Sequence, residues 1–535
     1  MNKKINIIVT LLLFSCPSLF GRWYSAKKQG LFESEMKVME MGDASVFRNK
    51  VLAGLANEKS ESELSKDYFL IGMSYFYEGE YSKAWENVLN SQKLFMLEEE
   101  KYFNQIVPYQ YSISKDFKEF ANDRCVVRLK GKTHIMKDDV FELMEKALNM
   151  VSEVFDYVPE DKILIEIYDS KEEFAYASTL GQSVLENSGA VGICKFNKLM
   201  ILSPQQLLLG FRWKDTIAHE LNHLIINRIS KVNCPLWLHE GIARYYDTRW
   251  RSKKDGIYYL TFSQKAKLVE AVKEDKLVAF ERMHPSLVYL DTQEEMNIAF
   301  AQVASVVDYL VRTYGDEIIQ KLLASLENYE LNDAFKQLIK MDFSQLEKTW
   351  LNYVKGWPDE EDQGALLDSN IFDKELDEIK KFVGADLQGN IRLGDKFFKN
   401  NNYLLAQKQY EKALSKESNN PVILNKLSKA YLMQNEYKEA EKQLLKSMEK
   451  NPNYVTSYTL LGDLYFELGR SDDAKAAFEE SAAINPFNPH VRKRLALLYI
   501  ESGNLPDARR ELEICNVLSP GDSEVNEGLR IIEDK

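Results

Sequence analysis

The chain has 535 residues, a formal net charge of −13, and 45% hydrophobic and 12% aromatic residues. This length exceeds one ordinary core and predicts roughly three or four domains, and the apolar content excludes wholesale disorder. The negative charge and the lack of a long basic run argue against a nucleic-acid partner, because phosphate binding depends on basic patches.

The N-terminus (1–21) has the pattern of a signal peptide. Two lysines precede the apolar stretch 5–15, which is too short to span a bilayer comfortably. The sequence LFSC that follows ends at Cys16 and resembles the bacterial lipobox, whose cysteine becomes lipidated and tethers the protein to a membrane. The alternative is ordinary cleavage after Ser18 or Gly21. Both predict export to the periplasm or cell envelope.

The remaining cysteines are few and far apart. They form no CxxC pair, so they predict neither a disulfide framework nor a thiolate zinc site. One disulfide could form in an oxidising compartment. These residues are Cys125, Cys194, Cys234 and Cys515.

Residues 27–120 are predicted to be a helical region. Within it, Gly72, Tyr75 and Ala84 keep the spacing of a helical-hairpin repeat that recurs near the C-terminus. We therefore expect at least one such hairpin here. An unrelated pair of amphipathic helices is the alternative.

The central region, 124–357, mixes helix and strand patterns. Residues 140–155 have helical periodicity, and residues 162–168 alternate as a strand. Residues 189–202 are typical of a glycine-led strand or hairpin. A helix, WKDTIAHELNHLIINRI, follows, with Asp215 as its expected N-cap.

This helix holds two of the six histidines of the chain, His219 and His223. Residues four apart lie on the same face of a helix, so both imidazoles can supply ligands to one metal ion. Glu220, beside the first histidine, can handle a proton. Two structural histidines in a buried helix are the alternative, but the apolar side of this helix favours a motif anchored in a core.

A third ligand is expected from the segment PLWLHEGIARYYD (235–247). Glu240 and His239 are adjacent there, and neighbours on a helix point about 100° apart, so only one of them can face the metal. The glutamate is preferred because of its Glu-Gly-x-Ala context. Two imidazoles and one carboxylate leave the fourth position of Zn²⁺ for water, which suits hydrolysis.

The HELNH motif and the later WLHEGIA segment together resemble the gluzincin metallopeptidases, in a bacterial branch often classed as peptidase MA-like. The resemblance covers about residues 125–355. It implies one Zn²⁺ per chain, bound by His219, His223 and Glu240, and it implies Glu220 as the general base. It also implies a thermolysin-like α+β fold whose edge strand, supplied by GAVGICKFNKLMIL, lines the substrate cleft.

The sequence departs from that family at two positions. Where thermolysin-type enzymes have an aspartate four residues after the third ligand, this chain has Arg244. Asp247 or Asn222 could orient a histidine instead. Phe300 stands where related chains tend to have a tyrosine that stabilises the oxyanion. The candidates for that role are Tyr245, Tyr246, Tyr289 and His284.

The C-terminal region, 387–535, is repetitive. A period of 34 residues is typical of tetratricopeptide (TPR) helix–turn–helix repeats, and it predicts four of them with a capping helix at 523–535. The acidic segment 358–386 is the expected linker. The recurring positions are Ala406, Ala440, Ala474 and Ala508; Phe397, Tyr431, Tyr465 and Tyr499; and Pro452, Pro486 and Pro520.

Two functions fit these patterns. One is an exported zinc metallopeptidase that hydrolyses peptide bonds in protein or peptide substrates, with TPR grooves that bind substrates or protein partners. The other is a cell-envelope TPR scaffold with an inactive peptidase-like domain. The intact motif residues favour the first. A purely structural or storage zinc site fits less well, because structural sites usually close all four positions.

Overall fold

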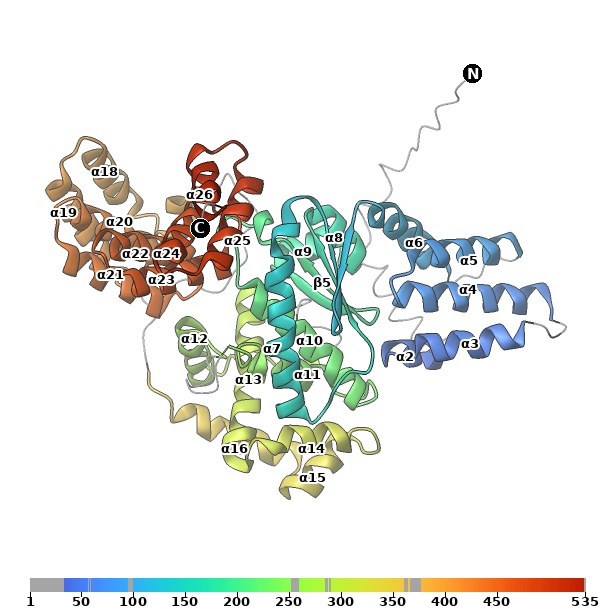
Figure 1. The fold of residues 1–535 in the computed structure, drawn as a ribbon. Coiled ribbons are helices and arrows are strands. Elements are labelled where there is room, and N and C mark those ends of the chain that lie inside the picture. Colours follow the sequence, from blue (N-terminus) through green and yellow to red (C-terminus); the bar gives the residue numbers. More distant parts are fainter. Residues whose placement is uncertain are drawn as a thin grey trace. The chain divides into compact units, whose positions relative to one another are not determined.

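The structure of the protein is a computed structural model (Figure 1). It describes residues 33–533, except 56, 58, 95–99, 252–258, 284–286, 288–289, 360–363 and 366–376. The predicted signal peptide with Cys16, and much of the predicted acidic linker, lie outside the described residues. The described part is mostly helical with one five-stranded sheet. None of its helices combines the length and the apolar character needed to cross a membrane.

The N-terminal helices belong to a compact unit of their own, which ends at Lys115. Helix α4 starts at a capping box, in which Ser60 and Glu63 each accept a backbone hydrogen bond from the other. Helices α4 and α5 approach closely at Gly72, where a Cβ atom would lie 3.1 Å from the Ala84 carbonyl oxygen. The helices are α2 (Glu33–Glu40), α3 (Ala44–Gly54), α4 (Glu61–Tyr77), α5 (Tyr81–Leu94) and α6 (Glu100–Ser114).

The second unit begins with the central sheet, in the strand order β1-β2-β3-β5-β4. β2, β3 and β5 run parallel to one another, while β1 and β4 are antiparallel edge strands. β3 and β5 are wholly buried, as expected for central strands covered on both faces. The strands are β1 (Lys118–Ala121), β2 (Cys125–Leu129), β3 (Ile163–Tyr168), β4 (Gly192–Lys195) and β5 (Lys198–Leu202).

One predicted boundary is wrong. The N-terminal helical region was expected to run to residue 120, but α6 ends at Ser114 and β1 already belongs to the sheet. This strand is short and mostly exposed, so its sequence has no buried alternation that would mark it. The strand predicted at 162–168 is confirmed as β3, and residues 189–202, expected to be a strand or a hairpin, form the β4–β5 hairpin.

Helices flank the sheet and connect its strands. The predicted helix at 140–155 is confirmed as α7, which starts three residues earlier. The connecting elements are a 3₁₀ helix at Gly131–Met136, α7 (Lys137–Phe155), α8 (Lys171–Ser178), α9 (Gln182–Ser188) and a 3₁₀ turn at Pro204–Gln206.

The two motif helices are α10 (Trp213–Ile229) and α11 (Leu236–Tyr246). Asp215 is not the N-cap, because α10 begins two residues before it. Its carboxylate instead accepts hydrogen bonds from Trp250 Nε1 and Arg251 Nε, at 3.1 and 2.7 Å. These two donors come from the segment after α11, which the local sequence of α10 could not reveal.

Further helices complete the central region. α13 is the longest of them and packs along α11. Its capping residue Thr292 accepts a hydrogen bond from the Glu295 amide. The elements are α12 (Phe262–Lys273), a 3₁₀ helix at Phe280–Met283, α13 (Gln293–Tyr314), α14 (Glu317–Ser325), α15 (Leu331–Ile339) and α16 (Phe343–Lys355).

The C-terminal helices stack as consecutive antiparallel pairs (Figure 1). Small residues let the helices of a pair meet: a Cβ atom at Gly394 would lie 2.5 Å from the Tyr410 ring. The prolines of the 34-residue period follow the ends of α21, α23 and α25. The helices are α18 (Gln388–Lys399), α19 (Tyr403–Leu414), α20 (Pro421–Leu432), α21 (Tyr437–Lys450), α22 (Val455–Glu467), α23 (Ser471–Ile484), α24 (Pro489–Glu501), α25 (Leu505–Leu518) and α26 (Ser523–Glu533).

The end of the predicted linker is structured. Helix α17 (Glu378–Phe382) lies within 358–386, and its Ile379 is buried in the hydrophobic core of the repeats. The repeat array therefore begins about ten residues before the expected start at 387. The reason is that α17 packs on α18 and α20, a contact that its own short sequence does not signal.

Candidate metal centre

Helix α10 presents its two histidines to a common point. His219 and His223 are one turn apart, and their Nε2 atoms lie 3.0 Å from each other. The apolar side of the helix, including Ile217, Leu221 and Leu224, is almost completely buried. The core therefore fixes the helix while the two rings face the opposite side.

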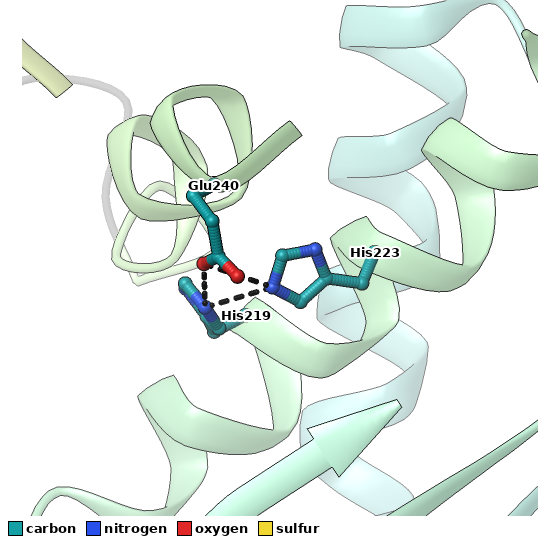
Figure 2. Close-up of side chains that lie close together, drawn as sticks. All are labelled: His219, His223 and Glu240. Atoms are coloured by element: carbon teal, nitrogen blue, oxygen red, sulfur yellow. Dashed lines mark hydrogen bonds and ion pairs between the residues drawn. The ribbon is translucent and has the colours of Figure 1, made fainter. Parts of the chain in front are cut away.

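Glu240 of α11 completes the cluster (Figure 2). Its Oε2 atom lies 3.6 Å from His219 Nε2 and 3.4 Å from His223 Nε2. Zinc bonds of about 2.0–2.1 Å in a tetrahedral arrangement place two ligand atoms roughly 3.3 Å apart. The three atoms thus fit around one Zn²⁺, and they are the group of possible metal ligands found among the described residues.

The two motif helices are held at this separation by close packing. The Asn222 side-chain amide donates to the Ala243 carbonyl oxygen at 3.3 Å, which ties α10 to α11. A Cβ atom on Gly241 would lie 2.6 Å from the Val303 carbonyl oxygen. The glycine after Glu240 is therefore required by the approach of α13 to α11.

Glu220 lies beside the cluster and against edge strand β4. Its side chain is 6% exposed, and burial raises the pKa of its carboxyl to about 7, although His223 opposes the rise. The carboxylate also accepts a hydrogen bond from the Cys194 backbone amide. A Cβ atom on Gly192 would lie 2.7 Å from Glu220 Oε1, so a larger residue there would displace the Glu220 side chain or the strand.

Glu240 is held as a carboxylate. Burial by itself would raise its pKa, but His223 and His219 together hold the pKa of Glu240 well below its ordinary value. An ionised carboxylate is the form that binds a metal ion.

His239, the alternative third ligand, does not join the cluster. Its Nδ1 atom lies 2.5 Å from His223 Nδ1, and its Nε2 atom lies 3.0 Å from Asn227 Oδ1. Burial, with the neighbouring His223, lowers the pKa of His239 well below its ordinary value, so the ring is neutral. The amide oxygen accepts from His239 Nε2, which leaves His239 Nδ1 to accept from His223. This series of hydrogen bonds leaves the lone pair of His223 Nε2 pointing at the cluster.

The other histidine of the cluster, His219, has a carboxylate on the side of its Nδ1 atom. Asp247 Oδ2 lies 3.8 Å from His219 Nδ1, and Arg244 Nη1 lies 3.0 Å from the same oxygen. Of the two residues predicted as alternatives to orient a histidine, Asp247 faces the ligand, whereas Asn222 bonds to α11. Arg244, which departs from the family pattern, holds that aspartate.

A cleft of about 1320 Å³ opens on this cluster. It is lined by His219, Glu220 and Glu240, by residues 188–194 around the edge strand, and by residues farther along the chain. Phe300, at the position where related chains tend to have a tyrosine, lines the cleft as well. A volume above that of usual small-molecule pockets suits a larger ligand.

Of the four oxyanion candidates, the two that the structure describes do not line the cleft. Tyr245 and Tyr246 are 2% and 0% exposed, and neither is among the residues that line the cleft. Their rings pack edge to face, and Tyr246 also packs on Phe155. The other two, Tyr289 and His284, lie outside the described residues.

Four polar residues in the cleft were not predicted from the sequence. Asn297 of α13 is 7% exposed, and its Nδ2 has no hydrogen-bond partner among the described residues. Tyr259 and Tyr353 both reach Asp308, which accepts from the Tyr353 hydroxyl at 2.6 Å. All four line the cleft. Asn297 is one turn from Phe300, and that spacing is the signal that could have identified it.

The structure describes four cysteines, Cys125, Cys194, Cys234 and Cys515. Burial raises the pKa of the Cys125 thiol to about 12, and the sulfurs are not paired in disulfides. The group of possible metal ligands among the described residues consists of His219, His223 and Glu240 and includes no thiol.

Comparison with known proteins gives two matches to family models. The model of the Peptidase MA superfamily matches residues 145–356, and a tetratricopeptide repeat model matches residues 397–464 and 465–525. No curated protein matches the chain.

Several solved structures match about a quarter of this chain. A crystal structure of MamA is 23% identical with a TM-score of 0.25, over 26% of this chain and 82% of that one. MamA from Desulfovibrio magneticus RS-1 is 16% identical with a TM-score of 0.27, over 28% and 86%. YrrB, a TPR protein with an unusual peptide-binding site, is 17% identical with a TM-score of 0.25, over 27% and 75%.

Proposed function

The chain carries a Peptidase MA superfamily domain followed by C-terminal TPR repeats, as its motifs predicted, and we propose that it is a zinc-dependent metallopeptidase. The observation that carries the proposal is the convergence of His219, His223 and Glu240, with ligand atoms 3.0–3.6 Å apart, beside a buried glutamate. A zinc ion bound there would act as a Lewis acid toward a peptide carbonyl and toward water.

The chain's own residues supply the proton transfers. Glu220 has a pKa near neutrality because of its burial, so its carboxylate can accept a proton from the attacking water. It can then pass that proton to the nitrogen of the leaving amine. Peptide hydrolysis needs both transfers, and a group with a pKa near the working pH serves both.

The edge strand β4 is suited to binding an extended peptide substrate. β4 pairs with β5 on one side only, and residues 192–194 line the cleft beside Glu220. An exposed strand edge offers backbone donors and acceptors to an extended peptide. We propose that the substrate backbone lies along β4, with the bond to be cut over the metal centre.

Export, the lipid tether on Cys16 and binding of a protein partner in the TPR grooves remain proposals. The first two depend on the pattern of the first 21 residues, and the third on the general use of such repeats as binding surfaces. We propose a location in the periplasm or cell envelope. Mass spectrometry of the protein purified from cell membranes would detect either a lipidated Cys16 or a free N-terminus after a later cleavage.

Three proteins test the peptidase proposal. The wild type should bind about one zinc per chain and cleave a generic peptide. His219→Ala should lose the zinc. Glu220→Gln should keep the zinc but lose hydrolysis by about three orders of magnitude or more, because the amide cannot take the proton. A metal-free wild type, or wild-type rates in Glu220→Gln, would contradict the proposal and favour an inactive scaffold.

A further inference from the structure

The cleft at the metal centre has one wall made by the repeat array. The segment 448–454, which joins α21 to α22, lines the same cleft as His219 and Glu220. We call this segment the repeat wall. The repeats and the central region belong to one compact unit, residues 116–535. The sequence predicted that the repeats bind partners in their own grooves. In the structure the repeats also border the cleft at the candidate metal centre.

Arg212 docks the repeat wall beside the helix that carries the histidines. This residue directly precedes α10, and its side chain is only 16% exposed. It donates to Asn453 Oδ1 at 3.1 Å and to the Pro452 carbonyl oxygen at 3.0 Å. It also donates to the Tyr458 hydroxyl at 3.1 Å and to Glu480 Oε2 at 2.8 Å. Two of these four hydrogen bonds reach the repeat wall and two reach α22 and α23, so one guanidinium fixes the repeats relative to α10.

The backbone before Arg212 makes a second contact with the repeats. The Phe211 amide donates to the Ile484 carbonyl oxygen at 3.1 Å. A Cβ atom at Gly210, whose φ is +72°, would lie 2.5 Å from that oxygen. Only a glycine permits this approach. Residues 210–211, immediately before α10, thus pack closely against the repeats.

A third contact lies on another side of the cleft. The Lys450 ammonium of the repeat wall sits 3.8 Å from the centre of the Phe262 ring of α12. Such a cation–π contact is favourable when it is partly desolvated, and the Lys450 side chain is 19% exposed. Contacts to both α10 and α12 make the repeat wall a fixed border of the cleft.

We propose that the repeat wall is part of the substrate-binding surface, and that it contacts an extended polypeptide some residues away from the bond that is cut. The inference rests on the peptidase function proposed above. The wall carries the apolar side chain of Met448 beside the ion pair of Glu449 and Lys450, in which Lys450 Nζ lies 3.0 Å from Glu449 Oε1. Such a mixture suits the successive side chains of an extended chain, whose residues are spaced about 3.3 Å apart. The preferred substrate is therefore a long unfolded segment and not a dipeptide.

The test measures binding to the zinc-loaded, full-length Glu220→Gln protein. A short probe is a hydroxamate with a single amino acid, which anchors at the metal. Two long probes add a mixed-sequence extension of about eight residues, one on each side of the hydroxamate. Lys450→Glu alters the repeat wall, and Lys442→Glu is the matched control, because it reverses a charge on the same helix at a residue 73% exposed and outside the cleft. Met448→Ala is a second wall variant without a charge change.

We expect at least one long probe to bind the unaltered wall about tenfold more tightly than the short probe. Both wall variants should lose most of that gain while binding the short probe normally, and Lys442→Glu should lose none. If the long probes bind no more tightly than the short probe, the repeat wall does not bind substrate. The same conclusion follows if the wall variants keep the higher affinity for the long probes. If the short probe fails to bind the zinc-loaded protein, the peptidase proposal itself is overturned and this inference with it.

Discussion

The imidazoles of His223 and His239 have nearly parallel planes, inclined by 12°, with ring centroids 4.6 Å apart and Nδ1 atoms 2.5 Å from each other. His239 is bonded in turn to Asn227 of α10. The residue that the sequence offered as a competing ligand is therefore a support for a ligand. A hydrogen bond to the far nitrogen of a metal-binding histidine fixes its tautomer and its orientation.

Replacing His239 should weaken zinc binding without removing a ligand. His239→Phe keeps a ring beside His223 but removes the acceptor, and we expect zinc affinity to fall about 10- to 100-fold. Asn227→Leu should also lower the zinc affinity, but by a smaller factor. Competition with a chelator at fixed pH measures both. Wild-type zinc affinity in His239→Phe would show that the hydrogen bond from His223 to His239 does not orient His223.

Gly192 is expected to be intolerant of even one methyl group. In Gly192→Ala the new Cβ would lie 2.5 Å from Thr216 Cγ2 and 2.7 Å from Glu220 Oε1, so the strand or the glutamate must move. We expect kcat to fall with zinc content unchanged, because neither contact involves a ligand. Adding Thr216→Ser removes one of the two clashes and should restore part of kcat. Full activity in the single variant would mean that β4 can shift freely.

Asn297 should be a residue whose loss lowers activity without lowering stability. A buried donor without a partner costs about 1–3 kcal/mol, so Asn297→Leu should leave the free energy of unfolding equal or higher. If its amide donates to substrate in the cleft, kcat/KM should fall at least tenfold in the same variant. Asn425, whose Nδ2 is equally unpartnered among the described residues but lies in the repeats, gives the control Asn425→Leu. Equal kcat/KM for wild type and Asn297→Leu would remove this residue from the site.

The contact between α7 and the repeats should weaken in acid. Burial would raise the pKa of Asp139, but Lys214, Arg510 and Arg492 outweigh it and lower that pKa from 3.8 to about 2. A depressed carboxyl pKa stabilises the folded state above the unfolded value, and this contribution is lost as pH falls from about 4 to about 2. The shift corresponds to about 2 kcal/mol.

Asp139→Asn should remove that dependence. Its free energy of unfolding should be lower than wild type at neutral pH, and the difference should shrink between pH 4 and pH 2. Urea unfolding of zinc-free protein across this range measures the effect without a contribution from metal loss. Asp138→Asn is the control, because that neighbour is more exposed, at 56% of its side chain. Parallel pH profiles for wild type and Asp139→Asn would contradict the prediction.

Local patterns predicted much of this molecule. The 34-residue period predicted the repeat pairs, because similar packing of a small residue against a large one recurs, as in Gly394 with Tyr410 and Gly462 with Phe478. The spacing of His219 and His223 predicted their convergence, since one helical turn fixes it. Glu240 needed the family resemblance as well, because it comes from a different helix. Strand β1 and helix α17 were missed, since short elements carry little periodicity.

The sequence by itself determined the metal-binding pair, the neighbouring glutamate and the repeat architecture, because helix geometry and a fixed period connect residues that are close along the chain. Only the tertiary structure decided that His239 supports a ligand, that Asn297 lines the cleft and that Arg212 docks the repeats beside the metal-binding helix. Each of these relationships joins separate helices. Their contacts depend on how whole elements pack, and no local pattern of residues encodes that packing on its own.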